Sequence, residues 1–365
     1  MCAVVDHENL RLDVDAALSR KVAELSAQIA AISPDGEALG EQIASLLGGG
    51  KRLRAAFAYW GFRACGGSAA GPKRQAAVRV GAALELFQAS ALFHDDVLDA
   101  AETRRGHLAA HRVFAARHVA AGWAGDADRF GEGAAILLGD LCLIAAQREL
   151  SAALIGIDSD RAEQVRATFD RMGTEVMIGQ FLDVQLSAQP WGDDPLADEE
   201  RTRVTVCARS ASYSVRYPLL LGAHLAGADE ATLAALDAFG LPLGEAFQLR
   251  DDVLGVFGDS SITGKPSGDD LREGKRTVLA ARTMRLGNAA QRSLLSAKLG
   301  DPDLTEDDIC ALRAAITDSG ALAATEALIA DLTAQALAAL TAAPLTDPGR
   351  STLYKLADIT VRRTF

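Results

Sequence analysis

Aromatic residues and sheet-forming patterns are scarce in this chain. Aromatic side chains account for 5% of its 365 residues, whereas Ala and Leu dominate its apolar half. This balance suits closely packed helices better than sheets. No stretch between turn signals alternates apolar and polar residues, as a half-buried strand would. The composition therefore predicts an all-α protein.

Cysteine motifs are also missing. The five cysteines are scattered, with no CxxC pair and no spacing typical of a zinc site. An odd, dispersed set is typical of reduced thiols in the cytosol. The first residues are acidic and lack the basic and apolar segments of a secretion signal. We therefore expect a cytoplasmic protein.

Positive charge and long apolar runs are lacking as well. The formal net charge of −12 argues against general nucleic-acid binding. It would also disfavour an anionic ligand unless divalent cations and local basic residues compensated. The longest apolar stretch, residues 134–146, is too short to cross a bilayer and contains Asp140. We expect no nucleic-acid partner and no membrane span.

Helix-forming segments fill most of the chain. Long runs of helix formers cover residues 76–101, 134–154, 161–188 and 204–226, with glycine- and proline-rich breaks elsewhere. No Pro/Gly/Ser-rich linker divides the chain into halves. The sequence predicts a single domain over residues 1–365, with a core at about 40–280 and peripheral C-terminal helices at 282–365.

Two aspartate pairs are the most informative feature. Asp95-Asp96 and Asp251-Asp252 lie inside apolar helical runs, and Asp99 follows the first pair by one helical turn. Aspartate pairs often cap helices or lie on solvated faces, but carboxylates among Leu, Phe and Val need compensation. Carboxylates suit Mg²⁺, which usually binds one or two of them together with phosphate oxygens. Two such faces across a cavity would hold a magnesium diphosphate.

A glycine-rich loop, residues 258–274, follows the second aspartate pair at once. Its charges could be incidental to a mobile, solvated connection. Next to a metal site, however, Lys265 and Lys275 are better explained as contacts to a bound diphosphate.

In these residues the chain resembles the trans-isoprenyl diphosphate synthases, the all-helical polyprenyl synthetases. At least six motifs recur in the family's order between about residues 48 and 277. The resemblance implies a single isoprenoid synthase-type helical bundle with a deep central cavity, and a homodimer. The family's two aspartate motifs bind magnesium, which implies three ions per active site. They match Asp95, Asp96, Asp99, Asp251 and Asp252 here. Gly255 stands where the second motif usually has its last Asp.

Four residues resemble the family's isopentenyl diphosphate site. They are Lys51 and Arg54 in a Gly-Gly-Lys-Arg-Leu-Arg segment, Gln88 where the family often has His, and Arg105. A diphosphate that arrives without its own magnesium needs direct cationic contacts, and Arg offers a two-pronged geometry that Lys lacks. Taken alone, the 49–54 segment could be a basic surface turn.

A second group resembles the allylic diphosphate site. Gln180 and Asp183 would lie where a carbocation develops and would stabilise it, although buried polar side chains bonding other helices remain an alternative. The family's Lys-Thr pair is Arg209-Ser210 here. The resemblance adds Arg104, Lys265 and Lys275 as contacts to the allylic diphosphate.

The implied reaction is head-to-tail prenyl transfer. An allylic diphosphate (dimethylallyl, geranyl or farnesyl) condenses with isopentenyl diphosphate, and the leaving diphosphate accepts the proton. The residues expected to take part in catalysis are Asp95, Asp96, Asp99, Arg104, Gln180, Arg209, Asp251 and Lys265.

Product length should depend on residues just before the first motif. Ser90 and Ala91 lie about one helical turn before Asp95, and their small size leaves a tunnel open. Phe87, a further turn away, could end it. We expect geranylgeranyl diphosphate, with longer chains and then farnesyl diphosphate as alternatives.

Two other functions share part of this pattern. A class I terpene cyclase has the first motif, but its second metal motif is of the Asn/Asp-x-x-Ser/Thr-x-x-x-Glu type. A silent partner subunit of a heteromeric synthase usually loses an aspartate motif, whereas this chain keeps the core of both. Both are less favoured than an active synthase.

Overall fold

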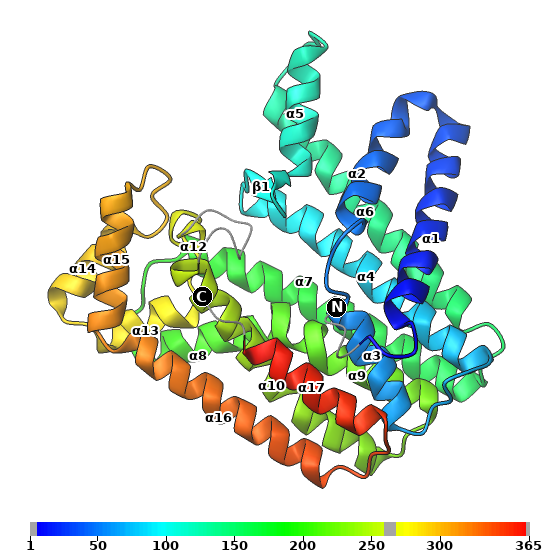
Figure 1. Ribbon diagram of the computed structural model, residues 1–365. Coiled ribbons are helices and arrows are strands. Elements are labelled where there is room, and N and C mark those ends of the chain that lie inside the picture. The colour runs from blue at the N-terminus through cyan, green and yellow to red at the C-terminus, as the bar shows by residue number, and fades with distance from the viewer. Residues whose placement is uncertain (1–5, 259–267, 363–365) are drawn as a thin grey trace. The chain divides into compact units, whose positions relative to one another are not determined.

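A computed structural model describes residues 6–258 and 268–362 (Figure 1). Lys265 lies outside the described residues. The described chain is almost entirely helical, and its only sheet is a hairpin of two strands of two residues each. This confirms the all-α prediction. By its internal contacts the chain divides into two compact units, which are described one at a time.

The first unit comprises residues 1–168, 218–233 and 344–355. Its central helix is α3 (Leu53–Ala64), in which almost every side chain is buried, Phe57, Trp60 and Phe62 among them. A helix that is apolar on all sides belongs in a core. Its other helices are α1 (Leu10–Ile32), α2 (Glu37–Leu47), α4 (Pro72–Leu98), α5 (Ala110–Ala120), α6 (Ala127–Ala153) and most of α9 (Tyr217–Ala226), with the short η1 (Pro34–Gly36).

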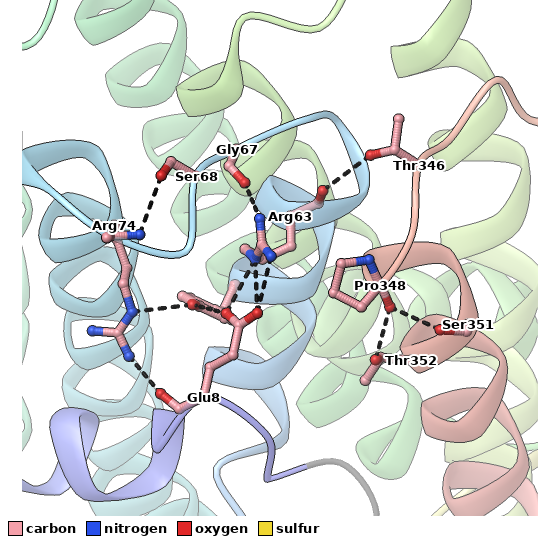
Figure 2. Close-up of polar contacts among 11 residues, drawn as sticks. Glu8, Arg63, Gly67, Ser68, Arg74, Thr346, Pro348, Ser351 and Thr352 are labelled. Atoms are coloured by element: carbon pink, nitrogen blue, oxygen red, sulfur yellow. Dashed lines mark hydrogen bonds and ion pairs between the residues drawn. The ribbon is translucent and has the colours of Figure 1, made fainter.

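The N-terminal segment of the first unit is tied to α3 by a charged cluster (Figure 2). Glu8 accepts hydrogen bonds from the Arg63 guanidinium at 2.9 Å and from the Tyr59 hydroxyl. Arg74 on α4 donates to the Glu8 carbonyl at 2.6 Å. Thr346 reaches the same region, where its N–H donates to the Ala64 carbonyl at 2.8 Å. These contacts fix the C-terminal half of α3, whose N-terminal end follows directly on the basic segment.

The second unit comprises residues 169–217, 234–343 and 356–365. Its apolar core joins α10 to the C-terminal helices through residues such as Val256, Leu279, Leu295, Ile309 and Leu312. Its helices are the second part of α7 (Ser159–Ala188), α8 (Pro195–Val206), η2 (Cys207–Arg216), most of α10 (Glu230–Phe257), α12 (Asp269–Arg272), α13 (Val278–Leu286), α14 (Ala289–Lys298), α15 (Glu306–Asp318), α16 (Ala321–Ala342) and the end of α17 (Gly349–Val361).

Most of the unit boundaries fall inside helices, namely α7, α9, α10 and α17, and only the boundary at 343/344 falls between two helices. Independent domains usually separate at exposed loops. The boundaries are therefore compatible with one domain, and the single domain with a deep central cavity stays a prediction.

A small hairpin was missed by the sequence analysis. Strands β1 (Thr103–Arg104) and β2 (His107–Leu108) pair antiparallel around Arg105 and Gly106. Both turn residues have positive φ, 55° and 78°, as a two-residue type I′ turn requires. Two-residue strands are too short to show an alternating pattern, so periodicity could not reveal them.

The expected helix at 204–226 is divided into three parts. Its middle part, η2, is a ten-residue π-helix between α8 and α9. Glycines on two neighbouring helices bring their backbones onto it: a Cβ at Gly179 would lie 2.8 Å from the Arg209 Cα, and one at Gly244 would meet the Ala211 backbone. Because π-helical segments often occur at functional sites, Arg209 and Ser210 lie in a suitable place.

Three helices, α4, α6 and α16, are long and apolar enough to cross a bilayer by length and composition. The sequence argument considered only the longest apolar stretch, residues 134–146, which is shorter than these helices, so it does not exclude a span. The most apolar window of α4 is 78% buried, as in a core helix, whereas those of α6 and α16 are 39% and 28% buried. The absence of a membrane span stays a prediction.

Candidate active site

The first aspartate motif closes the C-terminal end of α4. Asp96 is 2% exposed, while Asp95 and Asp99 are half-buried. Asp99 caps the helix, and its N–H donates to the Asp95 carbonyl at 2.8 Å, so both carboxylates belong to one turn. His94 lies against Gly139 on α6 and contacts the Ile136 carbonyl at 3.1 Å, which is a packing role.

Arg104 on β1 neutralises this motif. Its Nε donates to Asp96 Oδ1 at 2.6 Å, and its Nη2 lies 3.5 Å from Asp95 Oδ2. Burial raises the pKa of Asp96, and Arg104 opposes that shift. Burial also lowers the pKa of Arg104, but the charges of Asp96 and Asp95 outweigh it and the net shift is upward. Arg104 and Asp96 therefore compensate one another's burial.

A basic cluster lies beside the first motif. Arg105 is held by hydrogen bonds to the Leu46 and Gly49 carbonyls at 2.7 and 3.2 Å. Burial lowers its pKa, and the positive charges of Arg52, Arg104 and Arg54 lower it further. Positive charges gathered around this exposed guanidinium favour an anionic ligand. Lys51 is exposed next to this cluster, and Arg54 is 9% exposed.

The backbone before α3 is shaped to admit these cations. Gly50 has φ 112°, a region that residues with a Cβ avoid, and a Cβ there would lie 3.2 Å from Arg105 Nη2. The sequence analysis gave no role to Arg52, which is buried between Asp15 Oδ1 at 2.8 Å and Glu85 Oε2 at 3.3 Å. The sequence signal that could have revealed this buried arginine was Glu85, a charged residue inside an apolar helix. Arg52 thus fixes the turn that presents Lys51 and Arg54.

The chain-length candidates lie on α4. Phe87 and Ser90 are each 1% exposed, and the Ser90 hydroxyl has no hydrogen-bond partner among the described residues. Ala91 and Gln88 are partly exposed. Burial of Phe87 and Ser90 in the first unit agrees with an apolar surround, and their role in product length stays a prediction.

The second aspartate motif lies near the end of α10. Asp252 is 3% exposed, and its Oδ1 accepts a hydrogen bond from Gln248 Nε2 at 2.8 Å. Gln248 in turn accepts one from the Ser210 hydroxyl. Burial raises the pKa of Asp252 to about 7; Arg209 opposes the shift, whereas Asp270 and Asp251 add to it. Gln248 precedes the motif by three residues, and the sequence analysis gave it no role.

Arg209 on the π-helix pairs with Asp183 on α7, Nη1 to Oδ2 at 3.0 Å. Gly179 permits this approach, because its lack of a side chain lets α7 touch the π-helix backbone. Gln180 is half-buried on the adjacent turn of α7. The structure thus gathers Asp183, Arg209 and Ser210 with the second motif, all within one unit.

Lys275 lies after α12 in the same unit. Its Nζ is 2.6 Å from Glu273 Oε2 and 3.9 Å from Asp270 Oδ1. Its N–H donates to the Asp270 carbonyl at 3.0 Å. Asp270 itself lies against Gly255, the position where the second motif departs from its family.

The donor set fits magnesium only in part. Within residues 6–258 and 268–362, no three His, Cys, Asp or Glu side chains converge as a complete metal site. Mg²⁺ usually takes one or two carboxylates and completes its shell with water and phosphate oxygens, so a complete protein cage is not required. The buried Asp252 Oδ2 has no hydrogen-bond partner within the described residues, and a cation would satisfy it.

Comparisons with known proteins agree with this geometry. The polyprenyl synthetase family profile matches residues 37–316, most of the chain. The chain belongs to the polyprenyl synthetase family. It is a trans-prenyltransferase.

Two curated members of the family and one solved structure illustrate the similarity. A geranylgeranyl diphosphate synthase from Mycobacterium tuberculosis is 35% identical over 71% of this chain and 66% of its own length. A geranylfarnesyl diphosphate synthase from Aeropyrum pernix is 30% identical over 80% of this chain and 82% of its own. The crystal structure of a Corynebacterium glutamicum geranylgeranyl pyrophosphate synthase, complexed with isoprenyl diphosphate and magnesium, aligns with TM-score 0.89 and 34% identity over 98% of this chain and 99% of that one.

Proposed function

We propose that this trans-prenyltransferase condenses isopentenyl diphosphate with an allylic diphosphate and releases geranylgeranyl diphosphate. The observation that carries the proposal is that the candidate residues form one basic group and one acidic group. Arg105 lies in excess positive charge beside Lys51 and Arg54, whereas Asp252 is a buried carboxylate with an unsatisfied oxygen. The first arrangement suits a bare diphosphate, and the second suits one that arrives with cations.

Each candidate residue then has a defined task. Lys51, Arg54, Arg105 and Gln88 hold isopentenyl diphosphate. Arg104 and Arg209, each oriented by an aspartate, neutralise the allylic diphosphate as its C–O bond breaks, together with Lys265 and Lys275. Gln180 and Asp183 stabilise the allylic cation through their dipole and charge. The proton lost at the end goes to the leaving diphosphate.

Magnesium would be held by Asp95, Asp99 and Asp251, with Asp96 and Asp252 in support, and three bound ions would neutralise the allylic diphosphate. The crystallised relative, whose complex holds both isoprenyl diphosphate and magnesium, supports the choice of these two ligands. In the described chain, Asp96 is committed to Arg104, so its part is to position that cation.

A second copy of the chain is the proposed partner. Ile136, Leu137 and Ile144 on α6 are 40%, 59% and 57% exposed, and Val119 and Trp123 near α5 are 69% and 47% exposed. Large exposed apolar groups of this kind favour association. We also propose a cytoplasmic enzyme: the four described cysteines are unpaired thiols, and burial raises the pKa of Cys65, Cys142 and Cys207 to about 12.

Product analysis tests the proposal. The enzyme is incubated with Mg²⁺, isopentenyl diphosphate and each allylic starter in turn, and products are separated by chromatography. Geranylgeranyl diphosphate is expected. A cyclised hydrocarbon would favour a terpene cyclase, and no product from any starter would favour a silent subunit.

Two substitutions test the length assignment. Ser90→Phe should shorten the product to farnesyl diphosphate. A ring at this buried site would fill the tunnel one helical turn below the magnesium-bound diphosphate. Phe87→Ala should lengthen the product, because an extra isoprene unit can occupy the vacated volume and leave water at about 25 cal/mol per Å². If both variants give the wild-type product, the tunnel ends elsewhere.

A further inference from the structure

The residue directly before the second aspartate motif is a cation. Arg250 precedes Asp251 in the chain, and consecutive Cα atoms lie only about 3.8 Å apart. A guanidinium keeps its positive charge throughout the accessible pH range. Beside carboxylates that are proposed to hold magnesium, a free charge of this sign would repel the ion or pair with the carboxylates itself. How Arg250 is held therefore bears on any cation bound at this motif.

Arg250 is engaged by the C-terminal helices. Its Nη1 and Nη2 donate to Oε1 and Oε2 of Glu326 on α16, both at 2.6 Å. Its Nε donates at 3.2 Å to the carbonyl of Val361, the last residue of α17. The Arg250 side chain is 12% exposed, and all three residues belong to the second unit. A two-pronged Arg–carboxylate pair of this kind is strong and fixes the orientation of the guanidinium.

Both partners of Arg250 are negative. The Glu326 carboxylate neutralises its charge, and the last carbonyls of a helix carry a partial negative charge that favours a cation. Within residues 6–258 and 268–362, no hydrogen bond or ion pair joins Arg250 to Asp251 or Asp252. The guanidinium is therefore bonded to α16 and α17 and not to the motif that it adjoins.

We propose that Glu326 neutralises Arg250 and keeps its guanidinium off the second aspartate motif, so that the motif retains the negative charge needed to bind a divalent cation. The inference rests on the proposed magnesium-diphosphate function and gives the C-terminal helices a part in it. Glu326 is a positioning residue, because it acts through Arg250 and touches neither substrate nor metal.

A plain anchoring role is the alternative, in which the ion pair only holds α10 to α16 and α17. The two roles differ in what happens when both partners are replaced. An anchor is lost whether one partner or both are removed, whereas repulsion of a cation requires an uncompensated Arg250. Replacing Arg250 as well as Glu326 should therefore restore cation binding only if Glu326 acts through charge.

The test is a double-mutant cycle that is followed by Mn²⁺ binding. Free Mn²⁺ is counted by electron paramagnetic resonance while the full-length protein is titrated in the presence of a non-hydrolysable thiolo analogue of dimethylallyl diphosphate. The variants are Glu326→Gln, Arg250→Met and the double variant Arg250→Met/Glu326→Gln. The matched control is Glu245→Gln, which breaks another ion pair of α10, formed with Arg203 Nε on α8 at 2.6 Å.

We expect Glu326→Gln to weaken Mn²⁺ binding by about 10-fold, because an uncompensated guanidinium then lies close to the divalent ion. High salt should reduce this loss, because dissolved ions screen the repulsion. The double variant should bind Mn²⁺ within about 3-fold of the wild type, and Arg250→Met alone should not weaken binding. Glu245→Gln should change binding by less than about 3-fold, since its ion pair lies earlier on α10.

A charge-conserving variant gives a further check. Glu326→Asp keeps the carboxylate but shortens the side chain, so it should bind Mn²⁺ more tightly than Glu326→Gln does. Circular dichroism and melting temperatures identify any variant that fails to fold. Should Glu326→Gln fail in this way, Glu326→Ala and its double variant with Arg250→Met take its place in the cycle.

Three results would overturn the inference. The first is wild-type Mn²⁺ affinity in Glu326→Gln, and the second is a double variant that binds as weakly as Glu326→Gln, which would show a plain anchor. The third is equal loss in Glu326→Asp and Glu326→Gln. Failure of the wild-type protein to bind Mn²⁺ with the analogue would instead overturn the proposed function itself, so the two kinds of failure are distinguishable.

Discussion

The two aspartate motifs differ in what compensates their buried carboxylate. In the first motif, Asp96 is compensated by a cation of the chain itself, Arg104, at 2.6 Å. In the second, Asp252 receives a hydrogen bond from the neutral Gln248, while the nearest guanidinium, Arg209, is paired with Asp183. The buried Asp96 is thus compensated by an ion pair without any ligand, whereas the buried Asp252 is not. This difference predicts that the second motif responds more strongly to pH and to added cations.

The largest expected effect is loss of turnover. Asp95→Ala and Asp251→Ala should each reduce kcat by at least about 10³-fold, because each removes a carboxylate that would hold a metal ion acting on the transition state. Steady-state kinetics with a saturating allylic starter measure the loss, and circular dichroism should show unchanged helical content. Full activity of either variant at ordinary Mg²⁺ concentrations would contradict the role assigned to that motif.

The next effect is a difference in the free energy of unfolding between two variants, one at each motif. Arg104→Gln should destabilise the protein by about 3–5 kcal/mol, because it leaves the buried Asp96 carboxylate without its cation. Gln248→Leu should cost less, about 1.5–3 kcal/mol, since it removes one hydrogen bond to Asp252. Urea denaturation of the metal-free proteins measures both. The comparison fails if the two variants are equally destabilised.

A smaller effect is the pH dependence of the metal-free enzyme. The folded-state pKa of Asp252, raised to about 7 from 3.8, means that the folded state binds more protons between these values. Stability should therefore fall as pH rises from about 4 to 7 and level off above. Asp252→Asn should flatten this slope, which melting temperatures recorded in EDTA at pH 5 to 8 can measure.

Asp96→Asn provides the matched control for the pH prediction. It leaves the buried Arg104 with the more distant Asp95, whose Oδ2 lies 3.5 Å from Nη2, so it should lower the melting temperature at neutral pH, where Asp252→Asn should raise it. If both substitutions shift the melting temperature in the same direction, the two motifs do not differ as described.

The sequence predicted these motifs because both lie in long helices with strong signals. The apolar runs around Asp95 and Asp251 fixed the helix type, and their positions in α4 and α10 followed. What it missed depends on contacts between distant segments. The π-helix forms where Gly179 and Gly244 bring two other helices against η2. The helix propensity of residues 204–226 is a local property and does not depend on those neighbours, so it could not predict the π-helix.

The supporting residues were missed for the same reason. Gln248 becomes significant only because Ser210, 38 residues earlier, donates to it. Asp270 was visible as part of a charged loop, but its place beside Gly255 depends on how α12 returns to α10. The sequence shows only that position 255 lacks the usual Asp, whereas the fold places the Asp270 carboxylate against Gly255.

The most direct test of the central claim is the melting temperature of the wild-type enzyme with Mg²⁺, with the non-hydrolysable allylic analogue, and with both. If the motifs bind magnesium and diphosphate together, each ligand completes the other's site, and the shift with both should far exceed the sum of the separate shifts. Simply additive shifts would contradict a shared magnesium-diphosphate site.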